Sequence, residues 1–122
     1  MAGFKDRIKQ LRIENELTMK ELSLKLNLSE ATISYYESGK REPKDAVDYI
    51  KIADFFDVSL DYLLGRVDKK DSIIVNDTIE GHEIEMELDR KVYPDGLTHD
   101  QVVAILNQLK EMGMDFTKFK KE

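Results

Sequence analysis

Residues 18–40, TMKELSLKLNLSEATISYYESGK, constrain the fold more than any other part of this 122-residue chain. They predict two short helices joined by a tight turn. Thr18 and Glu21 have capping-box spacing at the start of the first helix. Ser29 is a favoured N-cap residue for the second helix, and Gly39 is a favoured residue just past its end.

The second helix has an outward face unlike an ordinary solvated one. At 100° per residue, Ile33 and Tyr36 fall on one side of the helix. The opposite side and its flanks carry small or hydrogen-bonding residues with almost no charge. Small side chains let a helix enter a DNA groove deeply, and hydroxyl groups exchange hydrogen bonds with base edges. Lys40 and Arg41 follow, where a phosphate backbone would pass. The pattern predicts a helix-turn-helix.

Two sets of candidate DNA-contacting residues follow from this arrangement. We expect contacts to base edges from Glu30, Ala31, Thr32, Ser34 and Tyr35. We expect contacts to phosphates from Thr18, Met19, Lys20, Ser38, Lys40 and Arg41. An alanine methyl group can meet a thymine methyl group, and a glutamate can accept a hydrogen bond from a cytosine amino group. The amide groups at the start of a helix favour phosphate binding.

The first half of the chain resembles the Cro/cI-type (Xre) family of bacterial and phage DNA-binding regulators. The matching residues are Leu11-Arg12, Leu17-Thr18, Glu21-Leu22, Thr32 to Ser34, Glu37 to Arg41, Pro43, Ile52-Ala53, Phe56 and Val58 to Gly65. The resemblance implies a mainly α fold, with a five-helix lambda-repressor-like domain over residues 1–66. The chain's size and tail also resemble those of the short immunity repressors of prophages and integrative mobile elements.

The resemblance also implies two structural roles inside this domain. It pairs Arg12 with Glu37 as a partly buried ion pair between the first helix and the second helix of the motif. Two unrelated surface charges remain the alternative. In related proteins the fifth helix often contributes to dimerisation, so Tyr62 or Leu63 is either exposed for that purpose or completes the core.

Hydrophobic periodicity extends the prediction along the rest of the domain. Phe4, Ile8 and Leu11 mark the core side of a helix that begins near residue 4. A fourth helix is expected from about Lys44 to Phe56, with one apolar stripe of Val47, Ile50 and Ala53 and a second of Tyr49, Ile52 and Phe56. Residues 67–71 read as a charged linker without core residues.

Residues 72–122 predict a small C-terminal module for dimerisation or regulation. Strands are expected over residues 72–79 and 82–88, joined by a Glu80-Gly81 turn. A helix capped by Thr98 and Gln101 follows and runs to about Met112. So small a unit buries its apolar stripes poorly, which favours a second copy as their cover. The candidate dimerisation residues are Ile84, Met86, Leu88, Val102, Ile105, Leu106 and Leu109.

Charge and composition limit the function further. The net charge is −6, yet residues 1–44 have a net charge of +2 and residues 67–122 a net charge of −5. DNA binding by the first part is compatible with this division. The chain has no cysteine, no N-terminal apolar leader and no apolar run of membrane-spanning length. We therefore expect a cytoplasmic protein that does not interact with membranes.

The sequence offers no pattern for catalysis. His82 and His99 have no companions at metal-ligand spacing, so we expect no metal site and no cofactor. The serine–lysine self-cleavage of larger repressors is excluded, because no serine follows Ser72. The acidic row of Glu83, Glu85 and Glu87 reads as the solvated side of a hairpin or as a docking surface for a basic partner. We predict no catalytic residues and no enzymatic activity.

The resulting hypothesis is a sequence-specific transcriptional regulator that binds double-stranded DNA. We expect a repressor that acts as a homodimer on a palindromic operator. An antitoxin whose C-terminal module binds a toxin, or a helix-turn-helix kept only as a protein-binding scaffold, remains the alternative. An antirepressor or a protease is a further candidate partner of the C-terminal module.

Overall fold

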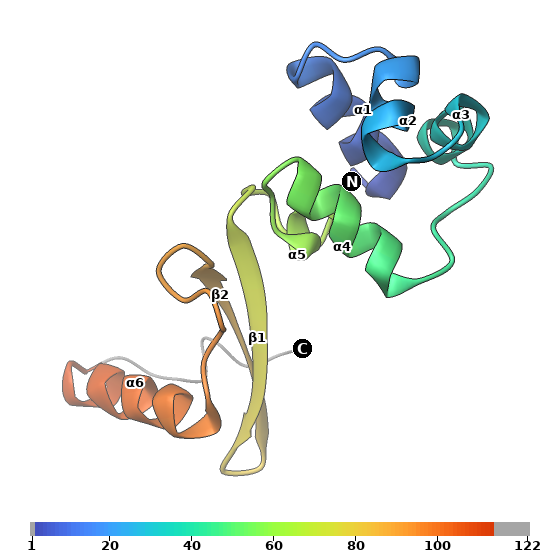
Figure 1. Cartoon of the computed structure of the whole chain (residues 1–122). Helices are drawn as coiled ribbons and strands as arrows, with labels where there is room; N and C mark the ends of the chain where they lie inside the picture. The colour runs from blue at the N-terminus through green and yellow to red at the C-terminus, as the bar shows by residue number, and fades with distance from the viewer. Residues whose placement is uncertain (1, 114–122) are drawn as a thin grey trace. The chain divides into compact units, whose positions relative to one another are not determined.

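The computed structural model describes residues 2–113, which form two compact units. The first unit ends at Asp71 and the second begins at Ser72. Helices make up the first unit, whereas a hairpin and one helix make up the second (Figure 1). The protein is mainly helical, as predicted. Residues 114–122, the end of the predicted C-terminal module, lie outside the described residues.

Five helices form the first unit. They are α1 (Phe4–Glu14), α2 (Met19–Leu26), α3 (Glu30–Ser38), α4 (Ala46–Phe55) and α5 (Leu60–Leu63). The predicted capping box at Thr18 is present, because its hydroxyl accepts from the Glu21 amide and its own amide donates to the Glu21 carboxylate. Ser29 and Ser59 are the N-cap residues of α3 and α5, and their side-chain oxygens accept from the Thr32 and Tyr62 amides.

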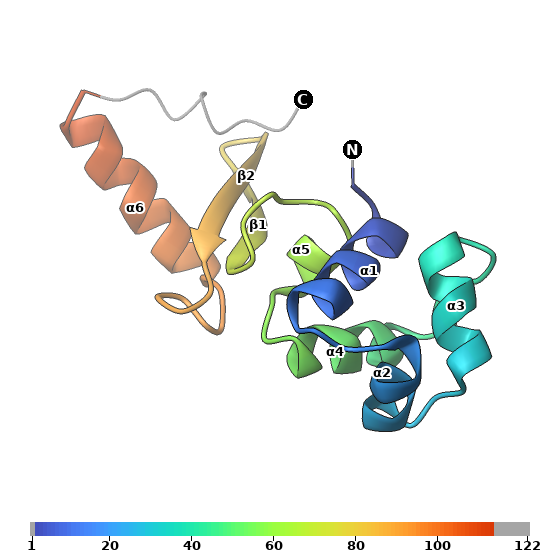
Figure 2. The ribbon, with the colours of Figure 1, turned by 90° about the horizontal axis from the view of Figure 1, so that it is seen from above.

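Fully buried aliphatic side chains from all five helices make the core of the first unit. They are Ile8 and Leu11 of α1, Leu22 of α2, Ile33 of α3, Ile52 of α4 and Leu63 of α5. Helix α1 packs against both α3 and α5, and lies between them (Figure 2). Burial of this apolar surface is the main force that holds the helices together.

Helix α4 differs from its prediction in two respects. It begins at Ala46 rather than near residue 44, with Asp45 at the N-cap position. Ile52 and Ala53 are buried, whereas Val47 is 59% exposed and Ile50 is 44% exposed. Hydrophobic periodicity identified both apolar stripes, but the first unit leaves Val47 and Ile50 of the first stripe exposed and buries only its Ala53.

The fifth helix and the segment after it belong to the core. Tyr62 and Leu63 are buried, so the reading in which they complete the core is correct. The expectation for residues 67–71 is wrong in one respect, since Val67 is also buried. The Lys70 carbonyl group accepts a hydrogen bond from the Ser59 amide at 2.7 Å. This segment is therefore packed onto the first unit.

The second unit begins with the predicted hairpin. Strands β1 (Ser72–Ile79) and β2 (His82–Asp89) pair antiparallel, with Ile79 opposite His82. The two connecting residues, Glu80 and Gly81, both have positive φ, of 51° and 79°. Two consecutive left-handed residues make the turn that suits the twist of a two-residue hairpin.

Helix α6 (His99–Glu111) covers one face of this hairpin, and the predicted capping box of Thr98 and Gln101 begins it. Ile79, Ile84, Met86, Val102 and Leu106 form the buried core between the hairpin and the helix. Ile84, Met86, Val102 and Leu106 are therefore not available as an exposed dimer surface, contrary to expectation. The other three candidate dimerisation residues, Leu88, Ile105 and Leu109, are half-buried. Met112, expected on the same stripe, is 71% exposed just past the end of the helix.

Candidate nucleic-acid interface

The turn between α2 and α3 is short, and a left-handed residue and a backbone hydrogen bond define its geometry. Asn27 ends α2 in the left-handed conformation, at φ 56° and ψ 45°. The Leu28 amide then donates to the Ser23 carbonyl group at 2.8 Å, which is the wrapping hydrogen bond of a Schellman motif. Ser29 begins α3 immediately afterwards. The two helices are thus joined as in a helix-turn-helix, and they pack directly against each other.

Helix α3 buries one side and presents the other to solvent. Ile33 is fully buried and Tyr36 is 7% exposed, so these two residues attach the helix to the core. The five candidates for base contacts all reach the surface: Glu30 and Ala31 are exposed, and Thr32, Ser34 and Tyr35 are half-buried. The accessible face is the one predicted from the sequence.

Tyr35 is joined to the candidate phosphate contacts at the end of α3. The Arg41 guanidinium group lies 5.0 Å from the centre of the Tyr35 ring, and the Lys40 ammonium group lies 5.8 Å from it. The Ser38 hydroxyl donates to the Tyr35 carbonyl group at 3.2 Å. Cations this close to an aromatic ring are attracted to its face. The position of Tyr35 is therefore coupled to the cations that follow the helix.

The start of α2 holds the other candidates for phosphate contacts. Thr18 and Lys20 are exposed and Met19 is half-buried. The capping box uses the Thr18 and Glu21 amides, whereas the Met19 and Lys20 amides have no partner within the helix. These amides and the Lys20 side chain suit an anion. The Glu21 carboxylate at the same end opposes one.

Arg12 and Glu37 form a bidentate ion pair between α1 and α3. Arg12 Nε donates to Glu37 Oε2 at 2.7 Å, and Arg12 Nη2 donates to Glu37 Oε1 at 2.9 Å. Arg12 Nη1 also donates to the Leu17 carbonyl group at 2.9 Å, just before α2. The two side chains are 13% and 3% exposed. The hydrogen bonds to Glu37 raise the pKa of Arg12. One guanidinium group thus fixes α3 relative to α1 and to the start of α2.

Arg7 is a buried residue that the sequence interpretation missed. Its guanidinium group lies 4.0 Å from the centre of the Tyr62 ring, and Nη2 donates to the Val67 carbonyl group at 3.4 Å. Arg7 lies three residues after Phe4 and four before Leu11, on the core stripe of α1. This position on the stripe is the sequence signal that could have predicted the burial of Arg7. Arg7 holds the end of the first unit in place.

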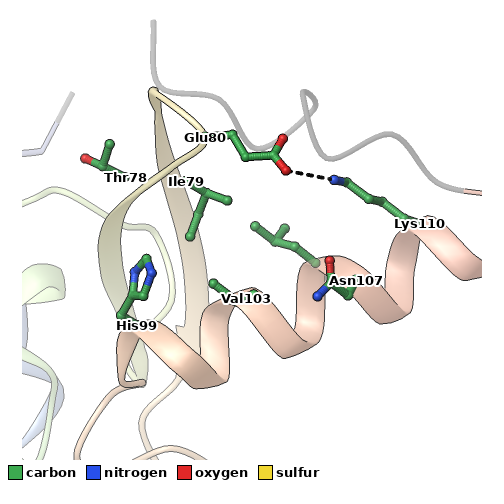
Figure 3. A pocket seen from close by; sticks show the side chains of 8 residues that line it. Thr78, Ile79, Glu80, His99, Val103, Asn107 and Lys110 are labelled. Atoms are coloured by element: carbon green, nitrogen blue, oxygen red, sulfur yellow. Dashed lines mark ion pairs between the residues drawn. The ribbon is translucent and has the colours of Figure 1, made fainter.

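His99 and Asp77 of the second unit form a polar pair that no sequence pattern indicated. His99 Nδ1 lies 2.8 Å from Asp77 Oδ2, so the pair joins the start of α6 to β1. The hydrogen bond to Asp77 raises the pKa of His99, and the same bond lowers the pKa of Asp77. Beside the pair is a hollow of about 280 Å³ with Val103 in its lining, and Glu80 and Lys110 approach at its other end (Figure 3).

Residues 2–113 contain neither a metal-binding cluster nor a membrane-spanning helix. No group of three or more His, Asp or Glu side chains in this range is arranged to hold a metal ion. No helix in this range is long and apolar enough to cross a bilayer.

The fold of the first unit and the α2–α3 motif define a helix-turn-helix domain. Residues 8–63 match the helix-turn-helix family model, so this part of the chain is a helix-turn-helix domain of the Cro/cI (Xre) type, which confirms the predicted resemblance.

Proteins similar to this chain are named HTH-type transcriptional regulators. The chain is 29% identical over 115 residues to the HTH-type transcriptional regulator ImmR of Bacillus subtilis strain 168, covering 90% of each chain. It is 36% identical over 66 residues to the uncharacterized HTH-type transcriptional regulator YobD and 39% identical over 61 residues to YqaE, both of the same strain. The last two matches span 57% and 52% of those proteins and 53% and 50% of this chain.

A solved structure shares the fold. The crystal structure of a transcriptional regulator from Listeria innocua superposes with a TM-score of 0.50 at 19% sequence identity. The match covers 92% of this chain and 96% of the other. At this identity the likeness concerns the fold alone.

We expect the Arg12–Glu37 pair to contribute strongly to the stability of the first unit. Because either change leaves a buried charge without its partner, Arg12→Met and Glu37→Gln should each lower the free energy of unfolding by about 2–4 kcal/mol. The double variant should lose less than the sum, since neither charge is then stranded. A denaturant double-mutant cycle measures this coupling. Additive losses would contradict it.

We expect the His99–Asp77 pair to make the second unit sensitive to pH. Because the folded pKa of His99 is raised, the contribution of His99 to stability is complete below its ordinary pKa of 6.5 and is lost as the pH rises through the folded value. NMR titration should therefore give His99 a pKa above 6.5, and Asp77→Asn should return it toward 6.5. Asp95→Asn, a change in the loop before α6, serves as the control. A His99 pKa that Asp77→Asn leaves unchanged would refute the link.

Proposed function

We propose that this chain, whose relatives are named transcriptional regulators, represses transcription by binding a palindromic DNA operator as a homodimer. The observation that supports it best is the outward face of α3. That face combines accessible small and hydroxyl-bearing side chains with two cations placed directly beyond the helix end. A groove of DNA offers base edges to such a face and phosphates to such cations.

The proposed contacts divide into two kinds. Glu30, Ala31, Thr32, Ser34 and Tyr35 read base edges. Thr18, Met19, Lys20, Ser38, Lys40 and Arg41 hold phosphates on either side of the groove. Phosphate contacts fix the position of the protein on any duplex, whereas base contacts distinguish one sequence from another. Sequence preference therefore depends on the first set, and general affinity depends on the second.

A modest positive charge supports a requirement for two copies. The net charge of residues 1–44 is only +2, so a single unit gains limited affinity from counterion release. Two linked units that read two half-sites gain a large effective concentration for the second contact. Leu88, Ile105 and Leu109 are the parts of the predicted dimer surface that the second unit leaves half-buried. We propose these side chains as the contact between two copies.

The proposal fits a cytoplasmic protein without a catalytic role. A toxin, an antirepressor or a protease remains a candidate partner of the second unit. Copurification of a tightly bound protein in place of self-association would favour that alternative.

Tyr35 and Lys40 should have separable roles in DNA binding. Tyr35→Ala should weaken binding to the operator and relax preference at one or two base positions, because Tyr35 lies on the outward face of α3. Lys40→Ala should weaken binding to every sequence and lower the salt slope by about one. Randomised-site selection and salt titration measure the two effects. Unchanged sequence preference in Tyr35→Ala would count against base reading.

Removal of the second unit should abolish most dimerisation while the first unit stays folded. The truncation belongs after Asp71, because Val67 is buried and the Lys70 carbonyl group holds the Ser59 amide. Operator affinity should then fall much more than non-specific affinity, since two half-sites are no longer linked. Sedimentation equilibrium of both proteins measures self-association. A truncated chain that dimerises as tightly as the full chain would assign the contact to the first unit, where Val47 and Ile50 are exposed.

A further inference from the structure

Lys5 of α1 lies against the end of α3. A β-carbon built on Gly39 would lie only 3.2 Å from Cδ of Lys5. Gly39 has φ +82° and ends α3 without a side chain of its own. The methylene groups of Lys5 therefore cover the backbone where the proposed phosphate contacts Ser38 and Lys40 flank Gly39.

This contact gives the end of α3 a third cation. The Lys5 ammonium group is two bonds beyond Cδ, and the side chain is exposed. Lys40 and Arg41 follow Gly39 directly in the chain. Lys5 comes from a helix outside the α2–α3 motif, so a second element adds a positive charge beside the end of α3.

Within residues 2–113, neither neighbouring carboxylate forms an ion pair with Lys5. Asp6 accepts a hydrogen bond from the Gly3 amide at 3.1 Å and so caps α1. Glu42 shares a shallow hollow with Lys5 and Ser38, and its side chain is exposed. Lys9, one turn further along α1, would not come within 4 Å of a β-carbon at Gly39. Lys5 is therefore distinguished from the other α1 lysine by its place beside α3.

We propose that Lys5 contacts the phosphate backbone of bound DNA, next to the phosphates held by Lys40 and Arg41. This inference rests on the proposed DNA-binding function and adds a contact from outside the helix-turn-helix. The recognised chemistry is the phosphodiester group, which every sequence shares. Lys5 thus adds affinity and orientation for α3 without sequence preference.

The test compares three full-length variants with the wild type. Lys5→Gln removes the charge, Lys5→Arg retains it, and Lys51→Gln removes an exposed charge from α4, a helix with no proposed DNA contact. Affinity is measured over a salt series with a labelled duplex of arbitrary sequence and with a duplex obtained by randomised-site selection. Thermal unfolding checks that each variant is folded.

Lys5→Gln should weaken binding to both duplexes by the same factor and lower the salt slope by about one. Lys5→Arg should keep the wild-type slope, and so should Lys51→Gln. A wild-type slope in Lys5→Gln, or an equal loss in Lys51→Gln, would overturn the proposed contact. Wild-type protein that binds neither duplex would instead refute the proposed function itself.

Discussion

The bidentate pair of Arg12 and Glu37 is the interaction that holds α3 in place against α1 in the first unit. Apolar burial of Ile33 attaches α3 to the core, but apolar contacts are non-directional and leave rotation of a helix weakly fixed. The planar guanidinium group donates two hydrogen bonds of defined geometry to the carboxylate, and it also donates to the Leu17 carbonyl group before α2. The pair therefore ties α3 to α1, while the buried Ile33 and Tyr36 leave the opposite side of α3 facing outward.

The same reasoning makes α1 the organising helix of the unit. Arg12 reaches α3, Arg7 reaches the Val67 carbonyl group, and Glu14 pairs with Lys70 at 2.7 Å. Charged side chains on a single helix thus hold both α3 and the last segment of the unit. Segments far apart in sequence are held by polar contacts of defined geometry, while the buried aliphatic side chains supply most of the stabilisation.

Local patterns made most of the fold predictable from the sequence. The capping boxes at Thr18 and Thr98 involve residues three apart, and a single reading of the chain finds them. The outward face of α3 was predictable because helical periodicity alone separates it from Ile33 and Tyr36. The burial of Val67 and the His99–Asp77 pair were not predictable, since they depend on contacts between distant segments. Periodicity likewise showed that Val47 and Ile50 are apolar, but it carries no information on what covers them.

The second unit buries its apolar side chains more completely than its small size suggests. A hairpin and one helix offer little depth for a core, yet Ile84, Val102 and Leu106 are almost fully buried within one copy. Association of two copies therefore needs a different surface from the one that stabilises the unit. The opposite face of the hairpin carries Glu83 and Glu87, both exposed, which disfavours contact with DNA. Under the proposed function, this acidic face favours DNA binding by the first unit and association of the second unit with another protein surface.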